Sequence, residues 1–474
     1  MSAAAAAGID DPQRAAIAAQ IERGRTAMAM LTGASQQRVD EAVTALAWAI
    51  YKPEHAKELA EMGVANTGLG NVADKITKNT RKTFGTLRDL LRARTVGVID
   101  DDPASGLVKY AKPVGVVAAI CPSTNPAATP ANKAMMALKG ANAVIIAPSP
   151  AGFATTARYV ELARAELEKA GFEPDLVQLL EPPVNKQATQ TLMELSDLIV
   201  CTGSQDNVRR AYSSGTPAIG VGAGNVPVIV DETADLDDAA QKICLSKCFD
   251  NATSCSSENS LILVDAVYDD AIAALERAGG YLVPADKHDT VVDTLWRGGK
   301  LNRHLIAKDV GILGEAFGLG LLPEGTKYLL VEETGIGPAA PLSGEKLSLV
   351  LTVYRAADFA HAKTLVRDIL NFQGIGHSCG IHTKRPERTR ELAEELDVVR
   401  VLVNQAHTFG NGGSFENALP FTLSMGCGTW AGNSISENLN YRHFINVTHL
   451  VTTVGEDRPA EKDLFGPFLE KYGR

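Results

Sequence analysis

The first part of the chain has apolar positions at the spacing of amphipathic helices. Between residues 13 and 94, positions such as Ile17, Ile21, Ala27 and Met30 recur at helical intervals, with charged residues on the intervening faces. This pattern predicts a helical N-terminal layer.

From residue 114 onward, short apolar runs alternate with helical stretches. The runs VGVVAAI, NAVIIA, DLIVCTG and PVIVD are almost free of polar side chains and rich in β-branched residues. Apolar strands between helices are typical of a parallel sheet that is covered on both faces. The pattern predicts an α/β protein with a doubly wound domain, and a second α/β passage follows from about residue 239 to 432.

Two further segments predict a small β arm. A hairpin is expected at about 95–112, where the sequence DDDPASG separates two strand-like runs, and a late strand-like run spans 445–454. An isolated hairpin is only marginally stable. We therefore expect both segments to complete a sheet on another copy of the chain, which makes the protein at least a dimer.

Length and composition narrow the class of protein. The 474 residues suffice for two or three domains, and 45% hydrophobic with 22% charged residues excludes a disordered chain or a disulfide-stapled miniprotein. The formal net charge of -10 provides no general positive field. We therefore expect neither nucleic acid nor a membrane surface as a partner.

The N-terminal residues, the length of the apolar runs and the cysteines indicate where in the cell the protein is expected. Residues 1–14 read as a frayed, alanine-rich start without a basic segment and apolar core, and no apolar run reaches the roughly 18 residues of a membrane span. The seven cysteines are odd in number and lack paired spacing, as expected of reduced thiols. We expect a soluble cytoplasmic protein.

One cysteine has an unusual context. Cys255 lies in FDNATSCSSEN, between small hydroxyl residues and just before an apolar strand. Small neighbours leave a thiol accessible, as a nucleophile requires. The alternative is a half-buried cysteine without chemical function.

A second segment, CTGS, joins an apolar strand to a helical run. Glycine at 203 permits close backbone approach, the hydroxyls of Thr202 and Ser204 are donors, and a helix N-terminus attracts phosphate. Ser204 also suits a plain helix cap. The loop GVGAGNVP, which contains Gly222, likewise fits either close ligand approach or a tight turn.

A third segment, CPSTNP, follows another apolar strand. Its Asn125 can direct an amide N–H at a developing oxyanion, or can simply form an Asx-turn.

Together these segments resemble a known family. In order along the chain, CPSTNP, VCTGS, FDNATSCSSEN, EKLSLVLTVYR, GIGHSCGIHT and LSMGCGTWAGNSISENL are similar to the aldehyde dehydrogenases, and more narrowly to their CoA-acylating branch. The resemblance runs from about residue 20 to 455 and implies a Rossmann-type cofactor domain within 1–238. It also implies a catalytic thiol domain at 239–432 and a return segment, oligomerisation strand and tail at 433–474.

The resemblance also implies residue roles. Cys255 occupies the position of the catalytic thiol, and Asn125 that of the oxyanion asparagine. The cofactor would be NAD or NADP, and CoA would be a co-substrate. The residues implied in dinucleotide binding are Thr202, Gly203, Ser204, Gly222, Glu345 and Pro148.

Three positions depart from the hydrolytic members of the family. Val221 stands where those enzymes have the glutamate that activates water, so the resemblance implies a thioester that persists until CoA attacks it. Glu258 and Glu345 are the neighbouring carboxylates that weigh against this inference. Ala147 and Val208 replace a lysine and a glycine of the cofactor site, which leaves NAD and NADP equally open.

The substrate end of the site is expected in the loop 404–415. Its glycines expose backbone amides, and Asn404, His407, Thr408 and Ser414 add donors without a full carboxylate, which suits an aldehyde with an anionic tail. The alternative is a flexible polar turn. We expect sulfoacetaldehyde first, succinate semialdehyde second, and acetaldehyde as a further alternative.

His377, in GIGHSCG, matches a histidine shared by the acylating branch. It is either a shuttle for the CoA thiol proton or a structural residue. Cys244 and Cys248 are one helical turn apart, but two thiols alone do not make a metal site. Two rival functions remain: a hydrolytic aldehyde dehydrogenase, and a non-catalytic oligomer that binds dinucleotide.

Overall fold

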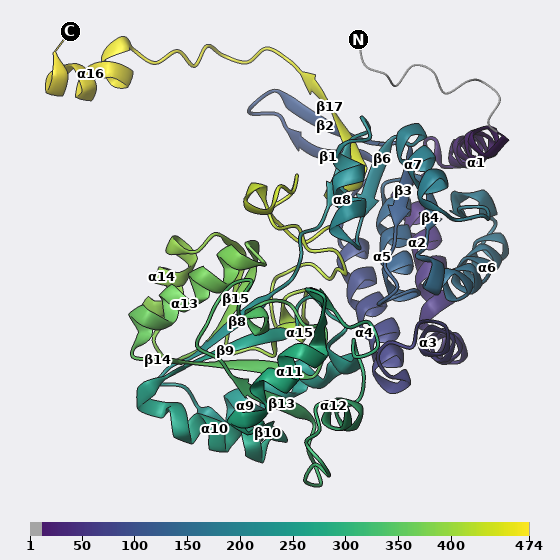
Figure 1. The fold of residues 1–474 in the computed structure, drawn as a ribbon. Coiled ribbons are helices and arrows are strands. Elements are labelled where there is room, and N and C mark those ends of the chain that lie inside the picture. The colour runs from purple at the N-terminus through teal and green to yellow at the C-terminus, as the bar shows by residue number, and fades with distance from the viewer. Residues whose placement is uncertain (1–11, 474) are drawn as a thin grey trace, which may run out of the picture.

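The computed structural model describes residues 12–473, so the expected alanine-rich start lies outside the described residues. Figure 1 shows two α/β units side by side, with the C-terminal helix standing away from both. The α/β class and the parallel strand arrangement predicted from the apolar runs are confirmed.

A helical layer precedes the first sheet, as the sequence predicts. Two of its helices begin at polar N-caps: the side chains of Ser35 and Asn71 each accept a hydrogen bond from the backbone N–H three residues further along the chain. The layer consists of α1 (Pro12–Met28), η1 (Ala29–Leu31), α2 (Gln36–Tyr51), α3 (Pro53–Thr67) and α4 (Val72–Leu91).

The first sheet is fully parallel, with the strand order β5-β4-β3-β6-β7. Helices α2, α5 and α6 pack on one face, and α1, α7 and α8 on the other, so both faces are buried. The strands are β3 (Val116–Ile120), β4 (Ala143–Ala147), β5 (Val177–Leu179), β6 (Leu198–Cys201) and β7 (Ala218–Gly220). The helices are α5 (Ala128–Lys139), α6 (Phe153–Lys169), α7 (Lys186–Leu195) and α8 (Gln205–Tyr212).

The second sheet is also parallel, with the order β10-β13-β14-β9-β8-β15-β16. Helices α9 to α12 cover one face, and α13 and α14 the other. The strands are β8 (Val226–Val230), β9 (Glu258–Val264), β10 (Gly280–Leu282), β13 (Tyr328–Glu332), β14 (Val350–Ala356), β15 (Gly376–His382) and β16 (Val398–Val403). The helices are α9 (Leu236–Cys248), α10 (Tyr268–Arg277), α11 (His288–Leu295), α12 (Val310–Ala316), α13 (Phe359–Phe372), α14 (Pro386–Glu395) and the short α15 (His407–Gly410).

Strand β8 belongs to the second sheet, although the boundary expected at residue 238 would assign it to the first domain. It lies before that position, yet it pairs with β9 and β15 in the larger sheet. The chain therefore passes from one sheet to the other between β7 and β8. The sequence does not reveal this because a strand buried on both faces has the same apolar pattern in either sheet.

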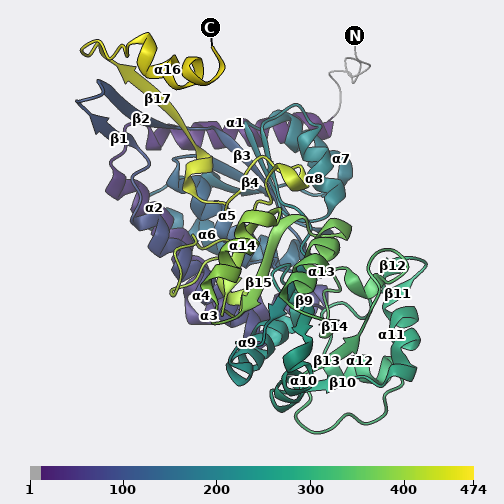
Figure 2. The same cartoon turned by 90° about the vertical axis from the view of Figure 1, so that its left-hand side faces the viewer.

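The predicted hairpin and late strand meet in a third sheet (Figure 2). Strands β1 (Gly97–Asp102), β2 (Leu107–Pro113) and β17 (Ile445–Val451) are antiparallel, with β2 in the middle. Helix α16 (Glu461–Tyr472) follows β17 and exposes Leu464, Phe465 and Phe468. A small hairpin of β11 (Trp296–Arg297) and β12 (Lys300–Leu301) completes the strands. Within residues 12–473 no helix is long and apolar enough to cross a membrane.

Candidate active site

A cavity lies where helix α4 of the first unit meets the segment before β9 of the second. Its lining includes Lys78, Arg81 and Lys82 from α4, Asn125 from the loop after β3, and Ser254 beside the cysteine singled out above. Among the described residues, no aspartate or glutamate lines this cavity. The surroundings are therefore electropositive, although the whole chain is acidic.

The backbone that leads to Cys255 is strained. Asp250, Asn251 and Ala252 have φ angles of 51°, 51° and 60°, in the left-handed region that non-glycine residues rarely adopt. Such residues cost about 1–3 kcal/mol each and persist only where surrounding contacts hold them. The backbone of Gly224 also approaches the cysteine so closely that a Cβ there would lie 2.6 Å from the Cβ of Cys255.

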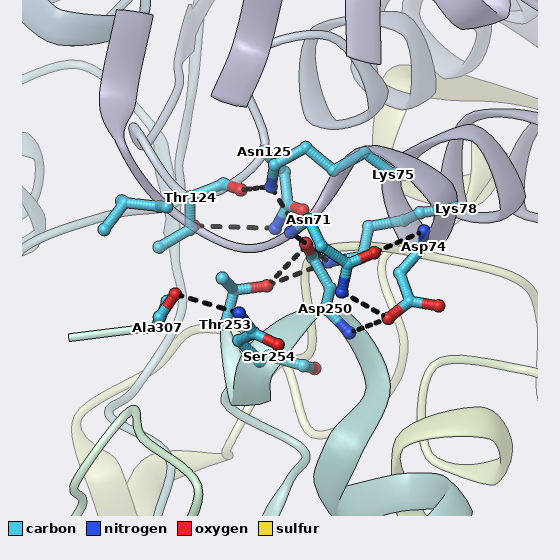
Figure 3. A network of polar contacts seen from close by, with 12 residues as sticks. Asn71, Asp74, Lys75, Lys78, Thr124, Asn125, Asp250, Thr253, Ser254 and Ala307 are labelled. Carbon is cyan, nitrogen blue, oxygen red and sulfur yellow. Dashed lines mark hydrogen bonds and ion pairs between the residues drawn. The ribbon is translucent and has the colours of Figure 1, made fainter. Parts of the chain in front are cut away.

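A buried ion cluster holds the strained segment (Figure 3). The Oδ2 atom of Asp250 accepts from Lys75 Nζ at 3.0 Å, from Lys78 Nζ at 2.5 Å and from Thr253 Oγ1 at 2.7 Å. The side chain of Asp250 is completely buried, and both lysines are about 95% buried. Since the lysines belong to α4, the cluster joins the two units immediately before the candidate nucleophile.

The charges in the cluster support one another. Burial alone would raise the pKa of Asp250, but Lys78 and Lys75 outweigh it and lower that pKa. Burial, and then the charge of Lys78, lowers the pKa of Lys75 to about 8, while Asp250 opposes the fall.

Lys78 also orients Asn125. Its ammonium group donates to Asn125 Oδ1 at 2.9 Å, and Lys75 donates to the carbonyl of Thr124 at 3.0 Å. A hydrogen bond to Oδ1 fixes which end of the amide faces the lysine. The Nδ2 end, whose contact with Thr124 Oγ1 is long at 3.5 Å, is left to donate into the cavity.

The thiol of Cys255 is neutral in the free protein. Burial raises the pKa of Cys255 to about 12, with Glu345 and Cys427 adding to the effect, while Arg400 and Ser256 oppose it. Nucleophilic attack therefore requires either a partner that accepts the thiol proton or a bound ligand that stabilises the thiolate.

The two neighbouring carboxylates are poor bases for water. Both oxygens of Glu258 are engaged, with Ser246 Oγ donating at 2.5 Å and the His407 N–H at 3.2 Å. Burial raises the pKa of Glu345 to about 8, which keeps most of this group protonated at pH 7. Val221 is 7% exposed and has no ionisable group.

Neither of the two candidate histidines, His377 and His407, is part of the cavity lining. His377 is the second residue of β15, where its Nδ1 lies 2.8 Å from Ser378 Oγ and its carbonyl accepts from Arg400. Burial, followed by Arg400 and His407, lowers the pKa of His377 well below its usual value. Burial also lowers the pKa of His407 to about 4. Both imidazoles are therefore neutral at pH 7.

The structure divides the loop expected to hold the substrate. Thr408 lines the cavity, whereas Asn404 and Ser414 do not. Both ends of the Asn404 amide bond the backbone of Thr383, and Ser414 Oγ accepts from the Glu416 N–H.

Sequence reasoning missed the cations of α4. Thr77, Lys78, Arg81 and Lys82 share one helical face, and the local sequence TKNTRK contains that spacing. A charged helix face is ordinarily solvated, so only the packing of the two units reveals this one as a cavity wall.

Three of the residues expected at a dinucleotide, Thr202, Gly203 and Ser204, lie at the carboxyl edge of the first sheet, whereas Glu345 precedes β14 of the second sheet. Ser204 caps α8 by accepting from the Asn207 N–H, and Thr202 Oγ1 lies 2.6 Å from Ser424 Oγ. No atom lies within 4 Å of where a Cβ on Gly203 would be, so the backbone is open to a phosphate. This turn fits a dinucleotide.

Two further expected cofactor positions flank this edge. Pro148 directly follows β4. The Gly222 N–H donates to Asn433, and the same glycine backbone approaches the sulfur of Cys427 closely.

Comparison with known proteins defines the class. A profile of the aldehyde dehydrogenase family matches residues 3–295. The sulfoacetaldehyde dehydrogenase (acylating) of Cupriavidus necator is 52% identical over 463 residues, which cover 97% of this chain and 93% of that protein. The enzyme of the same name from Bilophila wadsworthia is 45% identical, over 97% of this chain and 99% of that protein.

A solved structure of an aldehyde dehydrogenase is also similar to this chain. The crystal structure of an acetylating aldehyde dehydrogenase from Geobacillus thermoglucosidasius matches with a TM-score of 0.90 and 33% identity, over 94% of this chain and 98% of that chain. The chain therefore belongs to the aldehyde dehydrogenase family. The acylating relatives confirm the resemblance that the motifs indicate.

The buried cluster generates a stability prediction. Asp250→Asn leaves two buried lysines without their counter-charge, so the free energy of unfolding should fall by about 3–5 kcal/mol. Thr253→Val removes the hydrogen bond that the hydroxyl donates to the same carboxylate and the one it accepts from Lys78, and should cost about 1.5–3 kcal/mol. Urea unfolding at pH 7, followed by circular dichroism, measures both changes.

The difference between wild type and Asp250→Asn should also depend on pH. Because the folded pKa of Asp250 is lowered, its stabilisation is complete above the unfolded value near 3.9 and disappears as pH falls through the folded value. Equal stability of the two proteins at pH 7 would contradict the role given to the cluster.

Proposed function

We propose that this protein is a CoA-acylating aldehyde dehydrogenase whose aldehyde has an anionic tail. An aldehyde, CoA and NAD+ or NADP+ give an acyl-CoA, the reduced cofactor and a proton, reversibly. Sulfoacetaldehyde is the first candidate and succinate semialdehyde the second. The observation that carries the proposal is a cavity beside Cys255 that combines three cations with no lining carboxylate among the described residues.

The residues of the chain have distinct tasks. Cys255 Sγ attacks the aldehyde carbon, and the Nδ2 of Asn125 together with the Cys255 backbone N–H donates to the resulting oxyanion. A bound nicotinamide would supply the acceptor for the hydride of the aldehyde carbon, and the acyl group would then remain on Cys255 as a thioester. Lys78 holds Asn125 in the required orientation throughout.

The same site protects the thioester from water. Val221 cannot accept a proton, Glu258 is engaged at both oxygens, and Glu345 is mostly protonated at neutral pH. The CoA thiol then attacks the thioester. His377 is the proposed acceptor of its proton, since its imidazole is neutral and its Nε2 has no hydrogen-bond partner within residues 12–473.

We assign the dinucleotide to the carboxyl edge of the first sheet. Thr202, Gly203 and Ser204 would hold phosphate, and Glu345 would hold the ribose beside nicotinamide. Gly222 and Pro148 would line the path between them. His407, Asn404 and Ser414 stay predictions for the substrate side, while Thr408 has the support of its place in the cavity wall.

The arm supports a homo-oligomer, a dimer or tetramer. Strand β17 is nearly all exposed, and its outer edge is unpaired within residues 12–473. Seven free cysteines favour a reducing compartment, so we propose a cytoplasmic location.

The acyl-transfer chemistry can be tested by omitting CoA. The purified protein, given sulfoacetaldehyde and NAD+ or NADP+, should form about one equivalent of reduced cofactor per chain and then stop, because Cys255 stays acylated. Stopped-flow absorbance at the reduced nicotinamide band measures this burst, and CoA should restore turnover.

Two variants serve as controls. Cys255→Ser should remove the burst, whereas Cys248→Ser, a half-buried thiol on α9, should retain it. Sustained formation of reduced cofactor without CoA would instead identify a hydrolytic enzyme. A protein that binds the dinucleotide but reduces none would be non-catalytic.

The oligomer proposal gives a separate prediction. Leu450 is 49% exposed on β17, and Leu450→Lys places a charge on the proposed contact. Sedimentation equilibrium should show a dimer or tetramer for the wild type and a smaller mass for the variant. A monomeric wild type would contradict the role of the arm.

A further inference from the structure

We propose that Arg81 and Lys82 of helix α4, with the hydroxyl of Thr408, form the receptor for the anionic tail of the aldehyde. The inference rests on the proposed function and names the residues that select the substrate class. The chemical group recognised is a sulfonate bonded to the carbon next to the aldehyde.

The first support is unbalanced charge. Lys75 and Lys78 share the carboxylate of Asp250, but within residues 12–473 neither Arg81 nor Lys82 forms an ion pair. Among the described residues, the Lys82 ammonium donates only to the carbonyl of Gly412, at 2.7 Å. Glu416 acts on Arg81 electrostatically without pairing with it.

The second support is the cost of leaving these charges unpaired. Burial, followed by the charges of Arg81 and Lys78, lowers the pKa of Lys82 to about 7. A partly buried ammonium group is poorly hydrated and loses its proton more easily, and an anion bound beside it favours the charged form. Lys82 lines the same cavity as Ser254 and Ser256, the two chain neighbours of Cys255, so a bound anion would lie on the side of the cavity that leads to the thiol.

The third support is an unused hydroxyl. Thr408 is 93% buried, it lines the same cavity, and its Oγ1 has no hydrogen-bond partner among the described residues. A buried hydroxyl without a partner is costly unless a ligand supplies one. A sulfonate has three acceptor oxygens, enough for an ammonium, a guanidinium and a hydroxyl.

The aromatic surroundings strengthen the attraction. The guanidinium of Arg81 lies 5.1 Å from the ring centre of Phe409 and 5.4 Å from that of Phe421. Rings on these sides reduce contact with water, and the attraction between opposite charges rises as the local dielectric falls. A neutral aldehyde gains nothing from this arrangement.

The short spacing between the sulfonate and the carbonyl carbon of sulfoacetaldehyde also agrees with this receptor. In sulfoacetaldehyde a single carbon separates the sulfonate from the carbonyl carbon, so the anion must bind near the nucleophile. Lys82 and Arg81 meet this requirement because they line the same small cavity as Ser254 and Ser256, which flank Cys255 in the chain.

The test compares sulfoacetaldehyde with acetaldehyde, with CoA and cofactor saturating. For sulfoacetaldehyde, Lys82→Met should lower kcat/KM about 100-fold, mainly through KM, and Arg81→Gln about 30-fold. For acetaldehyde, both variants should stay within about threefold of the wild type, because no charge pair is lost. Lys82→Arg should recover much of the loss, and Lys57→Met, an exposed cation on α3, should behave as wild type.

Equal losses with both aldehydes would overturn the inference, since the cations would then act on the thiol. A loss expressed as a raised KM for CoA would also overturn it, by assigning them to the CoA phosphates. Should Lys82→Met fail to fold, judged by circular dichroism, Arg81→Gln gives the same comparison between the two aldehydes, with Lys82→Arg as the variant that keeps the charge.

A binding measurement separates this inference from the proposed function. Calorimetric titration with 2-hydroxyethanesulfonate, which lacks an aldehyde, should show binding to the wild type and about tenfold weaker binding to Arg81→Gln, while ethanol should not bind. Binding of this kind in a protein without CoA-dependent turnover would leave the receptor intact and reject the function. Turnover of sulfoacetaldehyde without Arg81-dependent binding would reject the receptor alone.

Discussion

The active site depends on one buried carboxylate. Asp250 connects two lysines of the first unit to a left-handed backbone segment of the second, five residues before Cys255. Neither the strained segment nor the buried lysines would be stable alone, because one costs backbone energy and the others lose hydration. Each is tolerated because the other is present, so the junction between the units also fixes the position of Cys255, the proposed nucleophile.

This junction places a group of cations inside an acidic protein. The formal charge of -10 describes the whole surface, whereas the cavity beside Cys255 has a wall of cations from α4. Lys78 contributes to the ion cluster and orients Asn125, so its charge is already compensated. Arg81 and Lys82, one turn further along the same helix, have charge left for a ligand.

Much of the fold follows from the sequence. Apolar β-branched runs between helices define both parallel sheets, and the turn DDDPASG defines the hairpin. The place where the chain leaves one sheet for the other does not follow, because β8 has the same apolar character as the strands on either side. Only pairing with β9 and β15 assigns it.

Less of the candidate site than of the fold can be predicted from the sequence. Motif order selects Cys255, Asn125 and the CTGS turn as candidates, because each lies in a short contiguous segment. Lys82 and Asp250 are 168 residues apart in the chain. Only the packing of the two units brings both to the same site, and no local sequence pattern predicts that packing. Within the loop 404–415 the sequence cannot separate the polar side chains from one another, because all of them are possible donors. In the structure Thr408 lines the cavity, whereas the Asn404 side chain is hydrogen-bonded to the backbone of Thr383.

The central claim is that this site forms a thioester on Cys255 and shields it from water. The most direct measurement is intact-protein and peptide mass spectrometry after mixing the protein with aldehyde and oxidised cofactor in the absence of CoA. The account predicts one acyl group on the peptide that contains Cys255, stable over minutes and transferred to CoA when CoA is added. An unmodified Cys255, with the free acid accumulating in solution, would contradict it.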